Sequence, residues 1–200
     1  MSKREQETGT RFPASSHKPG VDSVDWSGGR CYRAARTGGA MQLKIREARD
    51  DDAERLIDLI EACYSEYPGC VLAVDEEAPE LRAIASNHAQ RGGRFWVAES
   101  NGHLVGCAGL VPGDQGGSVE MKKLYVDRDW RKNGLGARLC SLVEVEAMSR
   151  GAATVELWSD TRFKDAHRLY ERRGYARGRK TRELHDASKS VEYYYRKDLA

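Results

Sequence analysis

The segment of this sequence best suited to ligand chemistry spans residues 123–136, where an expected strand leads through a basic turn into an expected helix. A helix start of this kind directs several free backbone N–H groups, and the positive end of the helix dipole, toward one place. Gly134 and Gly136 allow a ligand to approach the backbone closely, and Arg131 and Lys132 add positive charge. The combination predicts a diphosphate-binding site.

Three nucleotide-binding motifs compete for this segment. The G-x-x-x-x-G-K-[ST] pattern of a Walker loop is absent, and the G-x-G-x-x-G pattern of dinucleotide sites fails because Leu139 stands where the third glycine is needed. What remains is R-x-x-G-x-G, formed by Arg131, Gly134 and Gly136. Taken alone, this short motif leaves open an ordinary helix start whose glycines serve tight packing.

A second motif follows further along the chain. Residues 166–175 read AHRLYERRGY, which matches the pattern A-x-x-L-Y-E-x-x-G-[F/Y] at every specified position. With the two motifs in order, the chain resembles the GNAT N-acetyltransferase superfamily over residues 42–197. The resemblance implies acetyl-CoA as co-substrate, no metal, and transfer of the acetyl group to a primary amine by direct attack in a ternary complex.

The resemblance also implies how the donor binds. Acyl-CoA would lie between two parallel strands that splay apart, at residues 120–127 and 154–159, and its pantetheine would pair with the backbone of the first strand. The cofactor contacts expected on this basis are Leu124, Tyr125, Val126, Arg131, Lys132, Asn133, Gly134, Leu135, Gly136 and Ala137.

The chain departs from the family pattern at three positions. Phe163 stands where an asparagine often contacts the pantetheine arm, and Thr161 or Asp160 is a candidate replacement for that contact. Arg128 replaces a common proline, and Lys132 replaces a common glycine. The two basic substitutions favour binding of phosphates.

Tyr170, the tyrosine of the second motif, is the expected general acid. The resemblance gives it the role of protonating the departing thiolate, for which a phenol with an ordinary pKa near ~10 is suited. Glu120 opens the strand before the basic turn and is a candidate base acting through a water, with Glu156 on the facing strand as a weaker one. The alternatives are a packed helix tyrosine and solvated carboxylates.

The acceptor is expected to be a small-molecule or peptide amine, bound by the first helices and the last hairpin. Tyr64, Glu66 and Tyr67 are the candidate substrate-binding residues, because the resemblance places their helix beside the acceptor. Glu66 would suit a cationic amine, although an ordinary solvated helix face is an equal alternative. His167 and His185 stand alone without metal-ligand spacing, which favours surface or capping roles.

The hydrophobic pattern predicts alternating elements that would position these residues. The expected elements are strands at 42–48, 94–100, 103–111, 118–127, 154–159, 175–184 and 191–197, and helices at 51–67, 79–90, 134–150 and 162–173. Hairpins make neighbouring strands antiparallel, whereas a strand, helix, strand passage across residues 118–159 requires one parallel pair. The fold class is therefore α/β (α+β), with a mixed, mostly antiparallel sheet that contains one parallel pair. The resemblance adds helices on both faces of the sheet and a splay of the parallel pair.

Composition narrows the function further. Residues 1–40 show no hydrophobic period and are expected to be a disordered tail that is not necessarily native, with the acetyltransferase domain at residues 41–200. The 33 basic and 31 acidic residues nearly balance, which disfavours nucleic-acid binding, and no apolar run is long enough for a membrane helix. The five scattered cysteines are typical of a reducing, cytoplasmic setting. A homodimer and a catalytically silent acyl-CoA sensor on the same fold are left open.

Overall fold

The computed structural model describes residues 43–199, so the expected tail and the start of the expected domain lie outside the described residues. The elements, in chain order, are β1 (Leu43–Glu47), η1 (Asp50–Asp52), α1 (Ala53–Ser65), α2 (Val74–Glu77), η2 (Pro79–Ala83), α3 (Ile84–Gln90), β2 (Arg94–Ser100), β3 (His103–Pro112), β4 (Ser118–Val126), η3 (Arg128–Trp130), α4 (Leu135–Ser149), β5 (Thr154–Asp160), α5 (Lys164–Arg172), β6 (Ala176–Glu183) and β7 (Val191–Asp198). None of these helices is long and apolar enough to cross a membrane.

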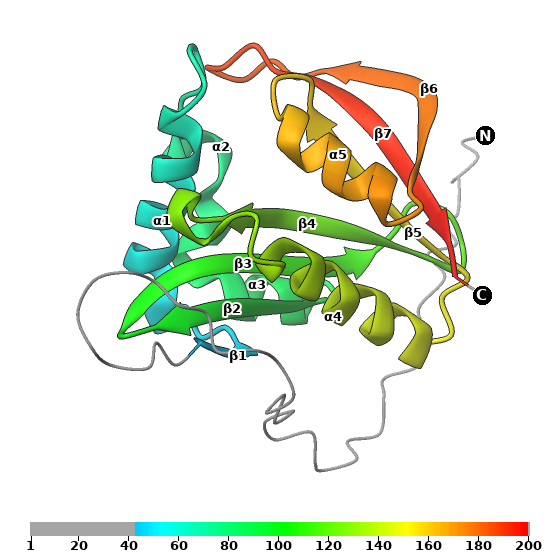
Figure 1. The fold of residues 1–200 in the computed structure, drawn as a ribbon, viewed down its shortest axis with the longest axis horizontal. Helices are drawn as coiled ribbons and strands as arrows, with labels where there is room; N and C mark the ends of the chain where they lie inside the picture. The colour runs from blue at the N-terminus through cyan, green and yellow to red at the C-terminus, as the bar shows by residue number, and fades with distance from the viewer. Residues whose placement is uncertain (1–42, 200) are drawn as a thin grey trace, which may run out of the picture.

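The described strands form a seven-stranded sheet in the order β1-β2-β3-β4-β5-β7-β6. Every neighbouring pair is antiparallel except β4 and β5, which run parallel. Figure 1 shows the two halves of the sheet diverging beyond this junction, with α5 beside the second half. The predicted fold class, a mixed sheet with one splayed parallel pair, is confirmed.

Helices cover both faces of the sheet and divide the core in two. On one face, Leu56, Leu59 and Ile60 of α1 pack with Phe95 and Val97 of β2. On the other face, α4 packs on the central strands, and a group of tyrosines from α5 to β7 completes the cluster. The α4 residues of this second core are Leu135, Leu139, Cys140, Val143 and Ala147, and its tyrosines are Tyr170, Tyr175 and Tyr195.

A buried carboxylate anchors the start of α1. Asp52 is fully buried and accepts bonds from both terminal nitrogens of Arg46, at 2.7 and 2.8 Å. It also accepts from the Arg49 amide at 2.8 Å and pairs with Arg55. The carboxylate therefore ties β1 to the first helix, because a buried charge is stable only when it is paired and hydrogen-bonded.

The splay follows directly from the strand register. The parallel pairing joins three residue pairs: Ser118 with Thr154, Val119 with Val155, and Glu120 with Glu156. Beyond Glu120, β4 continues to pair with β3, and β5 continues to pair with β7. The facing backbone edges of β4 and β5 are thus left open where the two strands separate.

Candidate active site

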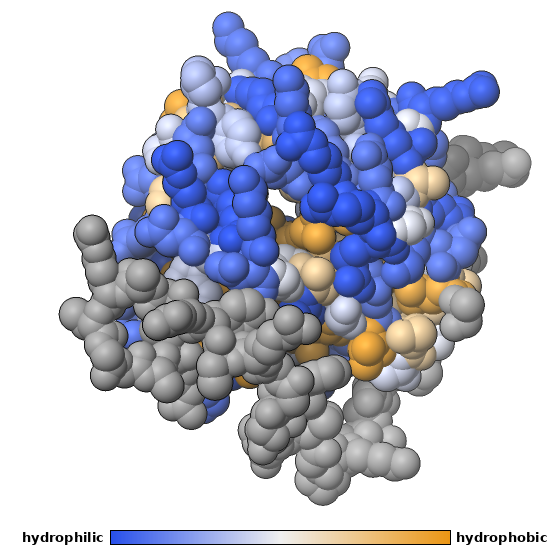
Figure 2. Space-filling model, in the orientation of Figure 1, coloured by the Kyte–Doolittle hydropathy of each residue, from blue (hydrophilic) through white to orange (hydrophobic). Residues whose placement is uncertain are grey.

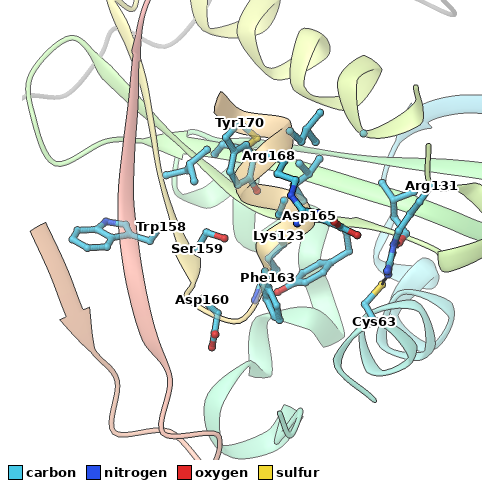
Figure 3. Close-up of a pocket in the computed structure, with 18 of the residues that line it drawn as sticks. Cys63, Lys123, Arg131, Trp158, Ser159, Asp160, Phe163, Asp165, Arg168 and Tyr170 are labelled. Atoms are coloured by element: carbon cyan, nitrogen blue, oxygen red, sulfur yellow. Dashed lines mark hydrogen bonds and ion pairs between the residues drawn. The ribbon is translucent and has the colours of Figure 1, made fainter. Parts of the chain in front are cut away.

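A cavity of about 730 Å³ occupies the gap between β4 and β5. One end is bounded by the turn before α4 and by α5, and the other end by the end of α1 and the β6–β7 hairpin. Figure 3 shows Tyr170, Arg168 and Asp165 of α5 on one side of this space and Arg131 and Cys63 on the other. In Figure 2, hydrophobic side chains floor a hollow whose rim is hydrophilic. The cavity thus lies in the splay of the sheet, and we call its end at the turn before α4 the first opening and its end at α1 and the β6–β7 hairpin the second opening.

The turn before α4 presents free backbone amides to the first opening. The amide of Arg138 is the first to bond within the helix, to the Gly134 carbonyl at 3.0 Å. Among residues 43–199, the six amides of residues 132–137 have no hydrogen-bond acceptor. Gly134 adopts φ 82°, a left-handed conformation that a side chain would strain. A row of free amides at a helix start is suited to binding an anion.

Gly136 serves packing as well as access. A Cβ atom built there would lie 3.0 Å from a terminal carbon of Leu169, so this glycine lets α5 approach the start of α4. The alternative that the sequence left open, glycines for tight packing, therefore holds at Gly136 alongside a binding role.

The side chain of Arg131 already has partners within the protein. Its Nη1 and Nη2 donate to the two carboxylate oxygens of Glu66 at 2.8 and 2.5 Å, and its Nε donates to the Val126 carbonyl at 2.9 Å. The residue expected to neutralise phosphate and the residue expected to attract a cationic amine thus form one ion pair. Lys132, by contrast, is exposed and has no ion-pair partner among the described residues.

The strand β4 bends where it enters the cavity. Lys123 has φ 52° and is the extra residue of a bulge between the pairs Gly109–Lys122 and Cys107–Tyr125. Its ammonium pairs with Glu80 at 2.8 Å. A non-glycine residue in this conformation is costly and occurs preferentially near functional sites. Sequence reasoning missed this bulge, because nothing in the local pattern distinguishes it from regular strand.

Tyr170 lies in the cavity wall and is buried, and its ring centroid lies 5.9 Å from that of Tyr175 and 5.7 Å from that of Tyr195. Burial, followed by the nearby Cys140 and Tyr195, raises the pKa of Tyr170 above its usual range. The phenol therefore stays protonated at neutral pH and is available as a proton donor.

Glu120 and Glu156 lie next to each other across the parallel pair, outside the lining of the cavity. Glu120 is held by Lys122 at 2.6 Å. Glu156 accepts from Ser118 at 3.0 Å and from the Tyr194 hydroxyl at 2.7 Å. The structure thus brings neither carboxylate together with Tyr170.

The second opening is lined by aromatic rings. Tyr64 lies with its hydroxyl 3.2 Å from that of Tyr125, and Tyr67 lies with its ring centroid 4.7 Å from that of Phe163. Burial raises the pKa of both Tyr64 and Tyr125, so these hydroxyls remain neutral. The substrate candidates Tyr64 and Tyr67 are thus cavity residues, whereas Glu66 is taken up by Arg131.

Asp160, considered as a replacement for the missing asparagine, is also bound within the protein. Burial acts to raise its pKa, but the side chain and amide of Arg162 overcome this effect and hold the pKa below its usual range. The Arg162 guanidinium bonds both carboxylate oxygens, at 2.9 and 2.6 Å. His167, expected near the surface, is buried and lies with Nε2 2.9 Å from the Asp160 carbonyl. Within the described part of the chain, no cluster of three metal-ligating side chains is present.

Comparisons with known proteins agree with this architecture. The acetyltransferase (GNAT) family profile matches residues 53–175. The chain is 30% identical over 139 residues to the uncharacterized N-acetyltransferase YhfO of Bacillus subtilis, covering 66% of this chain and 89% of that protein. It is 31% identical over 117 residues to N-acetyltransferase 8 of Homo sapiens, covering 56% of this chain and 49% of that protein.

Solved structures show the same fold at low identity. An acetyltransferase of the GNAT family from Staphylococcus aureus Mu50 aligns with a TM-score of 0.69 at 22% identity, covering 80% of this chain and all of that one (100%). The paiA N-acetyltransferase from Thermoplasma acidophilum, solved in complex with coenzyme A, aligns with a TM-score of 0.62 at 18% identity, covering 80% and 100% of the two chains. With the family profile spanning more than half of its length, the chain belongs to the acetyltransferase (GNAT) family.

Proposed function

We propose that this protein transfers an acetyl group from acetyl-CoA to a primary amine by direct attack in a ternary complex. The observation that carries the proposal is the cavity between β4 and β5, which has free amides at one opening, aromatic rings at the other, and Tyr170 in its wall. Such a cavity admits a donor and an acceptor from opposite ends. Chemistry would then occur where the two meet.

The residues at the first opening fit acetyl-CoA. The free amides of residues 132–137 suit a diphosphate, with Leu135 and Ala137 on the first turn of α4 and Asn133 before it. The open edge of β4, at Leu124 to Val126, suits an extended amide-containing arm that pairs as an additional strand. Bound there, acetyl-CoA supplies an activated acetyl thioester and holds it in the splay.

The protein's own groups handle the protons. The neutral acceptor nitrogen attacks the carbonyl carbon and the carbon–sulfur bond breaks, while Tyr170 donates its phenolic proton to the departing sulfur. The proton that the nitrogen loses passes to solvent water, and the Tyr170 phenolate takes a proton back from water to complete the cycle. The burial that keeps Tyr170 protonated also disfavours a free thiolate beside it, which matches the donor to its task. Glu120 does not line the cavity, so it could act as a base only through water molecules that connect it to the acceptor nitrogen.

The experiment that tests this function combines turnover with binding. CoA release is followed with a thiol reagent while the protein is offered acetyl-CoA and a panel of primary amines, and acetyl-CoA affinity is measured by calorimetry. Amine-dependent CoA release supports the enzyme. Tight acetyl-CoA binding without release for any amine would favour the silent sensor instead.

A further inference from the structure

The chain between α1 and α2 contacts the loop that joins β6 to β7, which belongs to the other half of the splayed sheet. We define the strap as residues 66–73, which leave α1 and lead to α2. In Figure 1 the loop joining β6 to β7 reaches across to this part of the chain. The Val71 amide donates to the Ser188 hydroxyl at 2.8 Å, and that hydroxyl donates to the Val71 carbonyl at 3.0 Å.

Further contacts fasten the strap and its neighbour α2 on the same side. The Ala187 amide donates to a carboxylate oxygen of Glu77, in α2, at 2.6 Å. A Cβ atom placed on Gly69 would lie 3.7 Å from the Arg162 guanidinium, so the strap also lies beside the turn after β5. Tyr67 adds its ring contact with Phe163. Two segments far apart in the sequence thus hold the strap over the second opening.

The strap forms a wall of the cavity. Tyr67 and Cys70 line it from the strap, and Leu184, Asp186, Ser190 and Glu192 line it from the hairpin side. These linings meet at the Val71–Ser188 bonds, so a polypeptide laid across the second opening would have to break them. Only an acceptor that fits beneath the strap reaches the acetyl group without rearrangement.

The residues that line the cavity also indicate which chemical groups such an acceptor carries. Aromatic rings come from Tyr64, Tyr67, Phe163 and Trp158, which favour a hydrophobic group. The carboxylates of Asp186 and Glu192 favour an ammonium group on the acceptor. Glu192 also forms an ion pair with Arg182, whose Nε lies 2.6 Å from its carboxylate.

Building on the proposed function, we infer that the acceptor is a small primary amine with a hydrophobic body, and that the strap excludes the amines of folded or extended polypeptides. The strap is a specificity element, and it takes no part in bond formation. A steric barrier can weaken the binding of a competing substrate without weakening that of the correct one. Many sites reach a selectivity in this way that attractive contacts alone do not give.

The test compares 2-phenylethylamine with a nonapeptide that carries an amino-terminal phenylalanine and one lysine, using acetyl-CoA and CoA release. The wild type is expected to favour the small amine by about 100-fold or more in kcat/KM. The double variant Glu77→Ala, Ser188→Ala loosens the strap and is expected to narrow that preference at least about tenfold. The control Glu76→Ala, Ser188→Thr keeps the hydroxyl and is expected to keep the preference.

The outcomes separate this inference from the function on which it rests. Comparable turnover of peptide and small amine by the wild type would overturn the inference while leaving the acetyltransferase intact, and so would an unchanged preference in the loosened variant. Absence of turnover with every amine would overturn the proposed function and the inference together. Melting curves for each variant show whether a loss of activity comes from unfolding.

Discussion

Arg131 and Glu66 hold each other through two parallel hydrogen bonds, one to each carboxylate oxygen, across 65 residues of sequence. Arg131 comes from the turn before α4, and Glu66 follows the last residue of α1. Because Arg131 Nε also donates to the last carbonyl of β4, at Val126, the pair fixes α1, β4 and the turn before α4 relative to one another. A bidentate guanidinium–carboxylate pair has the geometry needed for such positioning.

A double-mutant cycle measures that positioning. Arg131→Gln removes the positive charge and keeps a polar side chain, and Glu66→Gln removes the negative charge with little change in shape. In urea unfolding, the coupling free energy between the two substitutions is expected to be about 1 kcal/mol, since both side chains are partly solvated. Glu61→Gln, an exposed change on the same helix, serves as the control. Purely additive effects would show that the pair contributes no stability.

Lys132 is expected to provide the free charge at the donor opening, since Arg131 is paired. Lys132→Glu places a negative charge beside the free amides of residues 132–137 and is expected to weaken acetyl-CoA binding about tenfold. The matched control is Lys164→Glu, an exposed reversal on α5 outside the cavity lining. Calorimetric titration with acetyl-CoA decides the matter, and equal dissociation constants for the two variants would rule out this role for Lys132.

Tyr170→Phe tests the proposed general acid. The substitution keeps the ring and its packing against Tyr175 and Tyr195 but removes the proton donor. Turnover with the best amine is expected to fall about 100-fold while acetyl-CoA affinity stays within about twofold of the wild type. Wild-type turnover in the variant would assign the proton to another group. Tyr175→Phe, which removes a buried hydroxyl that has no partner among the described residues, is the control.

His88 predicts how stability responds to acid. It is 1% exposed, and burial is the main cause that lowers its pKa to about 4. The unfolded chain, with a histidine pKa near ~6.5, therefore binds a proton at a pH where His88 of the folded chain stays neutral. The free energy of unfolding consequently falls as the pH falls. Between about pH 7.5 and about pH 5 the expected loss is about 2 kcal/mol.

Chemical denaturation across that pH range measures the effect. His88→Gln removes the titrating group, so its stability should lose about 2 kcal/mol less than that of the wild type over the same interval. His103→Gln, in an exposed position at the start of β3, should follow the wild-type slope. Parallel slopes for the wild type and His88→Gln would show that another group binds the proton.

Local patterns predicted the elements well because their signals are short-range. The strands expected at 94–100 and 103–111 and the helix expected at 134–150 each depend on signals within a few residues, and the structure has β2, β3 and α4 there. The splay could be predicted only through the family resemblance. Its physical origin is the register of two strands separated by a helix, which no local window contains.

Side-chain partners were harder to predict than elements. Glu66 was expected to face an amine, but it pairs with Arg131, 65 residues later. The sequence around Glu66 gives no information about this distant partner. In the same way, nothing near Asp52 in the sequence indicates that Arg46 and Arg55 pair with it in a buried cluster. The aromatic side chain at Phe163 is visible in the sequence as a departure from the family, but its packing on Tyr67 depends on the fold.

The narrow junction between β4 and β5 also has a mechanical consequence. Only three residue pairs of the described strands join the two halves of the seven-stranded sheet. The half that contains β5, α5, β6 and β7 is therefore held to the other half largely by helix packing and by contacts of residues 66–77 with the loop between β6 and β7. A partner molecule lying along both open edges would act as a missing strand and link the halves. Amide hydrogen exchange should then slow in β5 and β7 together when the cavity is filled, as one cooperative unit.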